Sequence, residues 1–179
     1  MSKKVILIAI IIIVIGIGYW IYQPKEEVGG PMGSEKTALD PKNCTYIIER
    51  KDIALKDGYS EEEIVPGSAS KLITRYFGNE ALGDFNGDGL SDIAFILTQQ
   101  AGGSGTFYYA TVALGSDNGC KGTNAILLGD RIAPQTTEFR NGEIIVNYAD
   151  RKPDEPTTAA PSVGVSKYLQ VNDGVLVEI

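Results

Sequence analysis

Histidine is absent from this chain of 179 residues, and positive charge is scarce. Without histidine, the chain lacks the most common general base, the usual zinc ligand and any Ser-His or Cys-His catalytic pair. Its 16 Lys and Arg residues are outnumbered by 23 Asp and Glu residues, which gives a formal net charge of −7. No nucleic-acid partner is expected, because a basic surface is needed to neutralise phosphates.

Helical periodicity is missing from most of the chain. Beyond the first 22 residues, no long segment places apolar side chains three and four positions apart. Short β-branched and aromatic runs alternate with turn signals instead. Asn-Gly at 141–142 and Asp-Gly at 173–174 each separate two alternating runs, which is typical of a two-residue hairpin turn. We therefore predict a mainly β domain over residues 44–179, built of antiparallel hairpins as a sandwich or a barrel-like sheet.

The long apolar run of this chain lies near its N-terminus. Residues 5–22 carry no charge, and an α-helix of that length would span roughly 27 Å, close to the ~30 Å hydrocarbon core of a bilayer. The run is longer than the apolar part of a signal peptide, and no small-residue cleavage site follows it. Tyr19, Trp20 and Tyr22 would form an interfacial aromatic belt. We predict a cytoplasmic tip and one transmembrane helix at residues 1–22.

Charges on the two sides of this run predict its orientation. Lys3 and Lys4 precede the run, whereas Lys25 on the far side is followed at once by two glutamates. The positive-inside rule then places the N-terminus in the cytoplasm and the β domain outside, as in a single-pass protein of the cell membrane. Residues 23–43 are rich in proline, glycine and charge, so we expect a flexible linker there.

Cysteine is also rare, with Cys44 and Cys120 as the two examples. In an oxidising compartment they could form one disulfide, worth on the order of 4 kcal/mol in the chain-entropy model for a loop of this length. Two unrelated thiols are the alternative. We favour the disulfide because both residues lie at the ends of strand-like segments and not inside apolar ones.

The stretch GDFNGDGLSDIAF, residues 83–95, concentrates oxygen-bearing side chains and glycines. Counted from Asp84, side-chain oxygens fall at positions 1, 3, 5 and 9, and a glycine at position 6 permits a backbone reversal. Ca²⁺ takes six to eight hard oxygen ligands, and the carboxylates would repel one another without a cation. The predicted ligands are the side chains of Asp84, Asn86, Asp88 and Asp92 and the carbonyl of Leu90. The alternative is a polar turn.

This spacing matches the first half of an EF-hand loop, but position 12 is Phe95 and no flanking helix is expected. The stretch therefore resembles the D-x-[DN]-x-D-G-x-x-D calcium loops of FG-GAP and VCBS-type β-repeats, as in integrin α-chain propellers. The resemblance implies that the ninth-position aspartate closes a Ca²⁺ cage at the start of a strand. It covers this loop alone, and a propeller needs about four or more blades. The whole chain also resembles uncharacterised bacterial membrane-anchored β-domain proteins, on segments such as GDRIAPQT, which implies an architecture and no activity.

Two short motifs offer an enzyme as the alternative. Residues 68–71 fit S-x-x-K and residues 116–118 fit S-D-N, two signatures of serine β-lactamases and penicillin-binding proteins. The third signature is inverted here, and the domain is about half the size that such a fold needs. A small cell-surface serine hydrolase using Ser68 and Lys71 is therefore the alternative function.

The expected function is non-enzymatic: a membrane-tethered binding or envelope-organising module with one structural Ca²⁺. The lipid bilayer would be its first partner, through the N-terminal helix. A second partner would be a protein or an envelope polymer. The charged, proline-rich segment 149–162 is the candidate surface for that contact, because long loops in compact domains are functional or mobile.

Overall fold

The computed structural model describes residues 39–117 and 119–179, and within these ranges the chain forms β-strands and one 3-10 helix, η1 (Pro41–Asn43). The strands are β1 (Thr45–Ile48), β2 (Lys51–Ala54), β3 (Tyr59–Glu63), β4 (Lys71–Gly83), β5 (Asp92–Gln100), β6 (Phe107–Ser116), β7 (Gly119–Gly122), β8 (Ile126–Asp130), β9 (Ala133–Arg140), β10 (Glu143–Asp150), β11 (Val163–Asn172) and β12 (Val175–Glu178). No helix in the described part is long and apolar enough to cross a membrane. The predicted anchor at 1–22 lies outside the described residues.

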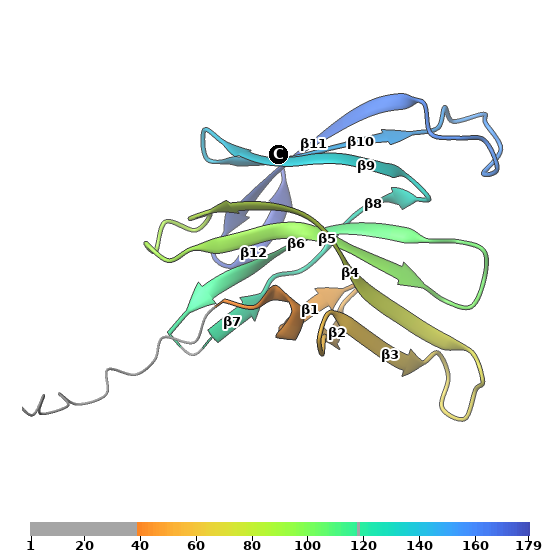
Figure 1. Ribbon diagram of the computed structural model, residues 1–179, viewed down its shortest axis with the longest axis horizontal. Helices are drawn as coiled ribbons and strands as arrows, with labels where there is room; N and C mark the ends of the chain where they lie inside the picture. The colour runs from red at the N-terminus through yellow and green to blue at the C-terminus, as the bar shows by residue number, and fades with distance from the viewer. Residues whose placement is uncertain (1–38, 118) are drawn as a thin grey trace, which may run out of the picture. The chain divides into compact units, whose positions relative to one another are not determined.

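Antiparallel pairing organises these strands into two large sheets and one small hairpin. The six-stranded sheet has the order β3-β4-β5-β6-β7, and β8 pairs with the other half of the β6 edge. The four-stranded sheet has the order β12-β11-β10-β9. Figure 1 shows the two sheets stacked as layers, with the β1–β2 hairpin on the opposite side of the six-stranded sheet. The predicted mainly β, antiparallel fold is confirmed, and the arrangement is layered.

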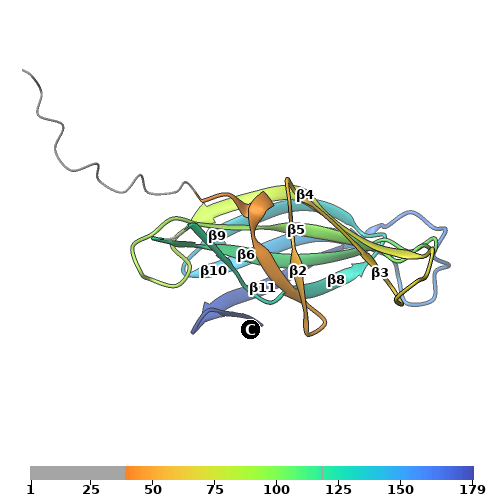
Figure 2. The same cartoon turned by 90° about the horizontal axis from the view of Figure 1, so that it is seen from below.

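The central strands β5 and β6 are buried on both faces. Successive side chains of a strand point to opposite sides, so alternate residues enter two different cores. Ala94 and Ile96 of β5 pack into the core between the two large sheets. Phe95 and Leu97 pack on the other side, against the β1–β2 hairpin. Figure 2 looks onto this hairpin, which crosses the strands of the six-stranded sheet. Burial on both faces explains why residues 93–97 of β5 form a continuous apolar run.

Two-residue turns join several of the paired strands. The predicted turns at 141–142 and 173–174 are observed, and all four residues have positive φ. A third turn joins β1 to β2 through Glu49 and Arg50, with φ values of 50° and 71°. Such turns favour glycine, asparagine and aspartate, so this pair carried no sequence signal for a hairpin.

A disulfide between Cys44 and Cys120 links the start of β1 to β7, and the two Cα atoms lie 5.8 Å apart. The predicted pairing is confirmed. Cys120 lies within strand β7. Cys44 is buried in the core beneath the hairpin, so the bond joins this core to an edge strand of the large sheet.

The folded region begins before Cys44. Asp40 caps η1 by accepting a hydrogen bond from the Lys42 amide at 3.0 Å, and Pro41 is buried. The Tyr46 hydroxyl donates to the Pro41 carbonyl at 2.7 Å. The last residues of the segment predicted as a linker, 23–43, therefore belong to the β domain.

Candidate metal centre

The predicted calcium ligands lie in the loop that joins β4 to β5, at one end of the six-stranded sheet (Figure 1). Pairing of Gly83 with Asp92 closes the loop at its base. Phe85 is buried, and its ring lies 4.8 Å from that of Phe139 in β9, centroid to centroid. Residues 86–89 are exposed. The core thus fixes the base of this loop, while its tip faces solvent.

Asp84 organises the tip through its carboxylate. One oxygen, Oδ1, accepts hydrogen bonds from the amides of Gly87 at 2.8 Å and Asp88 at 3.1 Å. The other oxygen, Oδ2, accepts from the amide of Gly89 at 2.9 Å. Gly87 and Gly89 have φ values of 77° and 82°, a region in which a side chain would strain the backbone. Backbone amides therefore point inward around the Asp84 carboxylate.

Asn86 and Asp88 continue the same pattern. Asn86 Oδ1 accepts from the Asp88 amide at 3.0 Å, and Asn86 Nδ2 donates to Asp88 Oδ2 at 2.9 Å. Asp88 Oδ1 accepts from the Leu90 amide at 2.7 Å. These local side-chain bonds hold successive residues in a tight polar turn.

Asp92, the first residue of β5, is fully buried at 0% exposure. Its carboxylate accepts from the amide of Phe85 at 2.8 Å and from that of Gly115 in β6 at 2.9 Å. Burial raises the pKa of Asp92 above its ordinary value, and the charges of Asp88 and Asp84 raise it further, against the lowering effect of the two amides. A buried carboxylate beside two more is a place where positive charge would be stabilising.

The chemistry of these groups fits Ca²⁺, because three carboxylates and one amide supply hard oxygens. Each carboxylate oxygen has more than one lone pair, so an amide bond does not prevent metal ligation. Neither Asp84 nor Asp92 forms an ion pair within residues 39–117 and 119–179. Across the same residues, no three Asp, Glu, Cys or His side chains form a preassembled metal-binding group. The structure thus brings the predicted side chains into one loop without forming a finished cage.

Gly115 is a supporting residue that sequence reasoning missed. A Cβ atom at this position would lie 2.6 Å from the Ser91 carbonyl oxygen, closer than a real contact allows. The absence of a side chain lets the loop approach β6 closely enough for Asp92 to accept the Gly115 amide. A single glycine inside an apolar strand carries no signal that distinguishes this role from others.

Of the residues of the hydrolase alternative, Ser68 lies in the turn between β3 and β4, and Lys71 is the first residue of β4. Ser68 Oγ accepts a hydrogen bond from the Ser70 amide at 3.0 Å. Lys71 Nζ forms an ion pair with Glu63 at 3.1 Å. Both contacts organise an exposed turn, and neither pairs the serine with a base.

Comparisons with known protein families, with curated proteins and with solved structures give no match to this chain.

Proposed function

We propose that this chain is a membrane-tethered extracytoplasmic β domain that binds one Ca²⁺ in the β4–β5 loop and acts as a binding or envelope-organising module. The observation that carries the proposal is the loop itself. Asp84, Asn86, Asp88 and the buried Asp92 belong to one loop closed at its base. Burial, and then the charges of Asp88 and Asp84, raises the pKa of Asp92. The side-chain oxygens of these four residues and the carbonyl of Leu90 would hold the ion.

A bound Ca²⁺ would stabilise the folded domain and would take no part in a catalysed reaction. It would offset the repulsion among the carboxylates and fix the connection between two central strands. Because the loop is closed only in the native sheet, binding would favour the folded state by RT ln(1 + [Ca²⁺]/Kd). At ten times Kd this amounts to about 1.4 kcal/mol.

The disulfide between Cys44 and Cys120 supports the extracytoplasmic location, since such bonds persist in oxidising compartments and are rare in the cytosol. The tether rests on the apolar run at 5–22, whose helix and bilayer contact remain predictions from the sequence. Tethering would keep the binding domain near the envelope surface through the linker.

Thermal unfolding with and without calcium tests the proposal. Extracellular calcium modules have Kd values near 10⁻⁴–10⁻³ M, so saturating calcium should raise the Tm of the full chain by a few degrees relative to EDTA. Asp88→Ala should remove that increase. In EDTA the variant should unfold near the wild-type Tm, because loss of a repelling carboxylate offsets loss of its hydrogen bonds with Leu90 and Asn86.

Asp154→Asn serves as the matched control, because Asp154 is an exposed acidic residue in another loop. It should keep the full calcium-dependent increase. An identical wild-type Tm in calcium and in EDTA would show that the loop is a polar turn and would remove the basis of the proposed function.

A further inference from the structure

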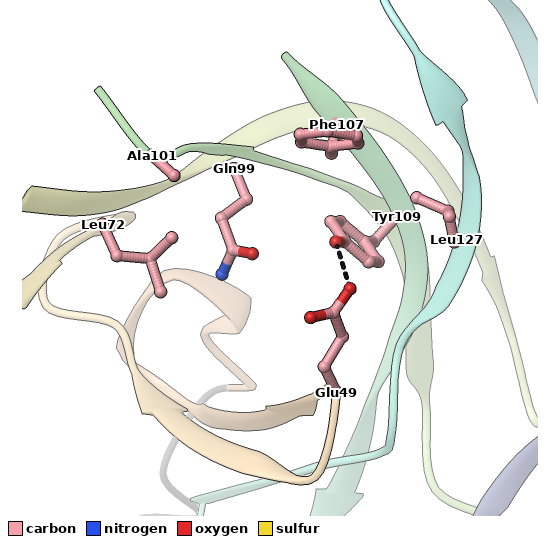
Figure 3. Close-up of a pocket in the computed structure, with 7 residues that line it drawn as sticks. All are labelled: Glu49, Leu72, Gln99, Ala101, Phe107, Tyr109 and Leu127. Atoms are coloured by element: carbon pink, nitrogen blue, oxygen red, sulfur yellow. Dashed lines mark hydrogen bonds between the residues drawn. The ribbon is translucent and has the colours of Figure 1, made fainter. Parts of the chain in front are cut away.

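A cavity of about 340 Å³ lies at the opposite end of β5 from the β4–β5 loop with the candidate metal ligands, called the metal loop below. Its polar lining consists of Glu49, Gln99 and Tyr109, and its apolar lining includes the ring of Phe107 (Figure 3). Aliphatic side chains of β4, β8 and the β5–β6 connection complete the wall. Gln99 is seven residues beyond Asp92 on the same strand, which separates the two places by about 23 Å. The cavity is therefore a distinct candidate site.

Glu49 is the one charged side chain in this lining. The hydroxyl of Tyr109, sixty positions away in sequence, donates to Glu49 Oε1 at 3.2 Å. Burial, and then the charge of Glu49, raises the pKa of Tyr109 to about 12, so the phenol remains a donor at neutral pH. Within the described residues Glu49 forms no ion pair. Its second oxygen, Oε2, is an acceptor available to a ligand.

The backbone at Glu49 is held in a costly conformation. Glu49 and Arg50 both have positive φ, a backbone region that is unfavourable for residues other than glycine. Ile48 and Ile53, buried on either side of the turn, hold the hairpin against the sheet and maintain this geometry. The turn places the Glu49 carboxylate over the sheet face, beside Tyr109 (Figure 3). Such strain often accompanies a functional position.

Gln99 and Phe107 favour a ligand that carries a cationic group on an apolar chain. Gln99 is buried at 7% exposure, and its Nε2 donates to Thr74 Oγ1 at 3.2 Å. This bond leaves Gln99 Oε1 on the side of the cavity that faces Glu49 (Figure 3). Phe107 is 38% exposed, and an aromatic ring attracts a cation to its face.

We propose that this cavity binds a small primary amine. The ammonium group has three donors, which would reach Glu49 Oε2 and Gln99 Oε1, and its apolar stem would lie against Phe107. The volume is at the lower end of the range of about 300–1,000 Å³ for small-molecule sites, which favours a ligand of few heavy atoms. A negative carboxylate without a cationic partner in the lining disfavours anions.

Calorimetric titration of the full chain in a neutral detergent tests this assignment. The probes are phenethylammonium, its neutral isostere 2-phenylethanol and the anion 3-phenylpropionate. We expect the ammonium probe to bind more tightly than the alcohol and the anion to bind least. Glu49→Gln keeps an acceptor for Tyr109 but removes the charge, and it should weaken ammonium binding about tenfold or more.

Asp52→Asn is the matched control, since Asp52 is an exposed acidic residue on the same hairpin outside the lining. It should bind the ammonium probe as wild type does. The assignment is overturned if wild type binds the ammonium and the alcohol alike, or if Glu49→Gln binds as wild type does. It is also overturned if wild type shows no binding up to roughly 10 mM. Thermal unfolding of each variant checks that it is folded.

Discussion

At the scale of single residues, Asn124 joins the two sheets by acting as a substitute peptide group. Its Nδ2 donates to the Leu176 carbonyl at 2.9 Å, and its Oδ1 accepts from the Leu176 amide at 2.8 Å. Leu176 is in β12 of the four-stranded sheet, and its side chain is buried in the core between the sheets. One side chain thereby satisfies a donor and an acceptor on a partly buried backbone.

Replacing Asn124 by alanine should leave both Leu176 groups without their partner. A buried unsatisfied group costs about 1–3 kcal/mol, so Asn124→Ala should reduce the free energy of unfolding by roughly 2 kcal/mol. Urea unfolding at an unchanged m-value measures this loss. Asn172→Ala, at an exposed position in β11, is the control and should stay within about 0.5 kcal/mol of wild type. Equal effects of the two substitutions would show that Asn124 does not join the sheets in this way.

At the scale of strands and loops, local patterns predicted those features that depend on local chemistry. The turns at 141–142 and 173–174 were predictable because asparagine, aspartate and glycine accept positive φ at low cost. The Glu49–Arg50 turn was not, because burial of its flanking isoleucines decides its conformation.

The two candidate sites also differ in how far a local sequence pattern predicts them. The oxygen spacing of the metal loop lies within nine consecutive residues, so the sequence displays it directly. The amine cavity joins Glu49 to Gln99 and Tyr109, which come together only through the crossing of the hairpin over the sheet. No local pattern predicts that crossing, and the strand order that creates it is a long-range property.

The segment from 149 to 162, expected as a long partner-binding loop, is anchored at its base. Ala149 and Asp150 belong to β10. The Arg151 guanidinium donates to the Ala159 carbonyl at 2.5 Å, to that of Asp130 at 3.2 Å and to that of Arg131 at 3.0 Å. This side chain thus ties the loop to itself and to the connection between β8 and β9. Its role in partner contact stays a prediction.

Arg151→Ala should release the loop while leaving the layered core intact. The three carbonyls would turn to solvent, so we expect cleavage of residues 151–162 by proteinase K to become several-fold faster with little change in Tm. Mass spectrometry of the early fragments locates the cut. Lys152→Ala, which removes an exposed side chain beside it, should cleave at the wild-type rate. Wild-type kinetics in Arg151→Ala would show that the guanidinium does not hold the loop.

At the scale of the whole domain, one sheet supports both candidate sites. β5 carries Asp92 at its first residue and Gln99 near its last, and both of its faces are buried. The loop with the candidate metal ligands therefore lies at the end of β5 opposite the cavity. The hairpin that supplies Glu49 is covalently linked to the sheet through Cys44 and Cys120. Stability of the hairpin, and with it the shape of the cavity, should depend on that bond.

Removing the disulfide should therefore have the largest effect of any change discussed. The bond closes a loop with a sequence separation of 76, for which the chain-entropy model gives on the order of 4 kcal/mol. This is a large part of the 5–15 kcal/mol typical of a domain, so Cys44→Ser with Cys120→Ser should lower Tm by roughly 10 °C or more. Reductant should lower the wild-type Tm in the same way and leave that of the double variant unchanged.

Maleimide labelling of the chain taken directly from cells should find no free thiols until a reductant is added. Two free thiols at that point would place the domain in a reducing compartment and contradict its proposed extracytoplasmic location.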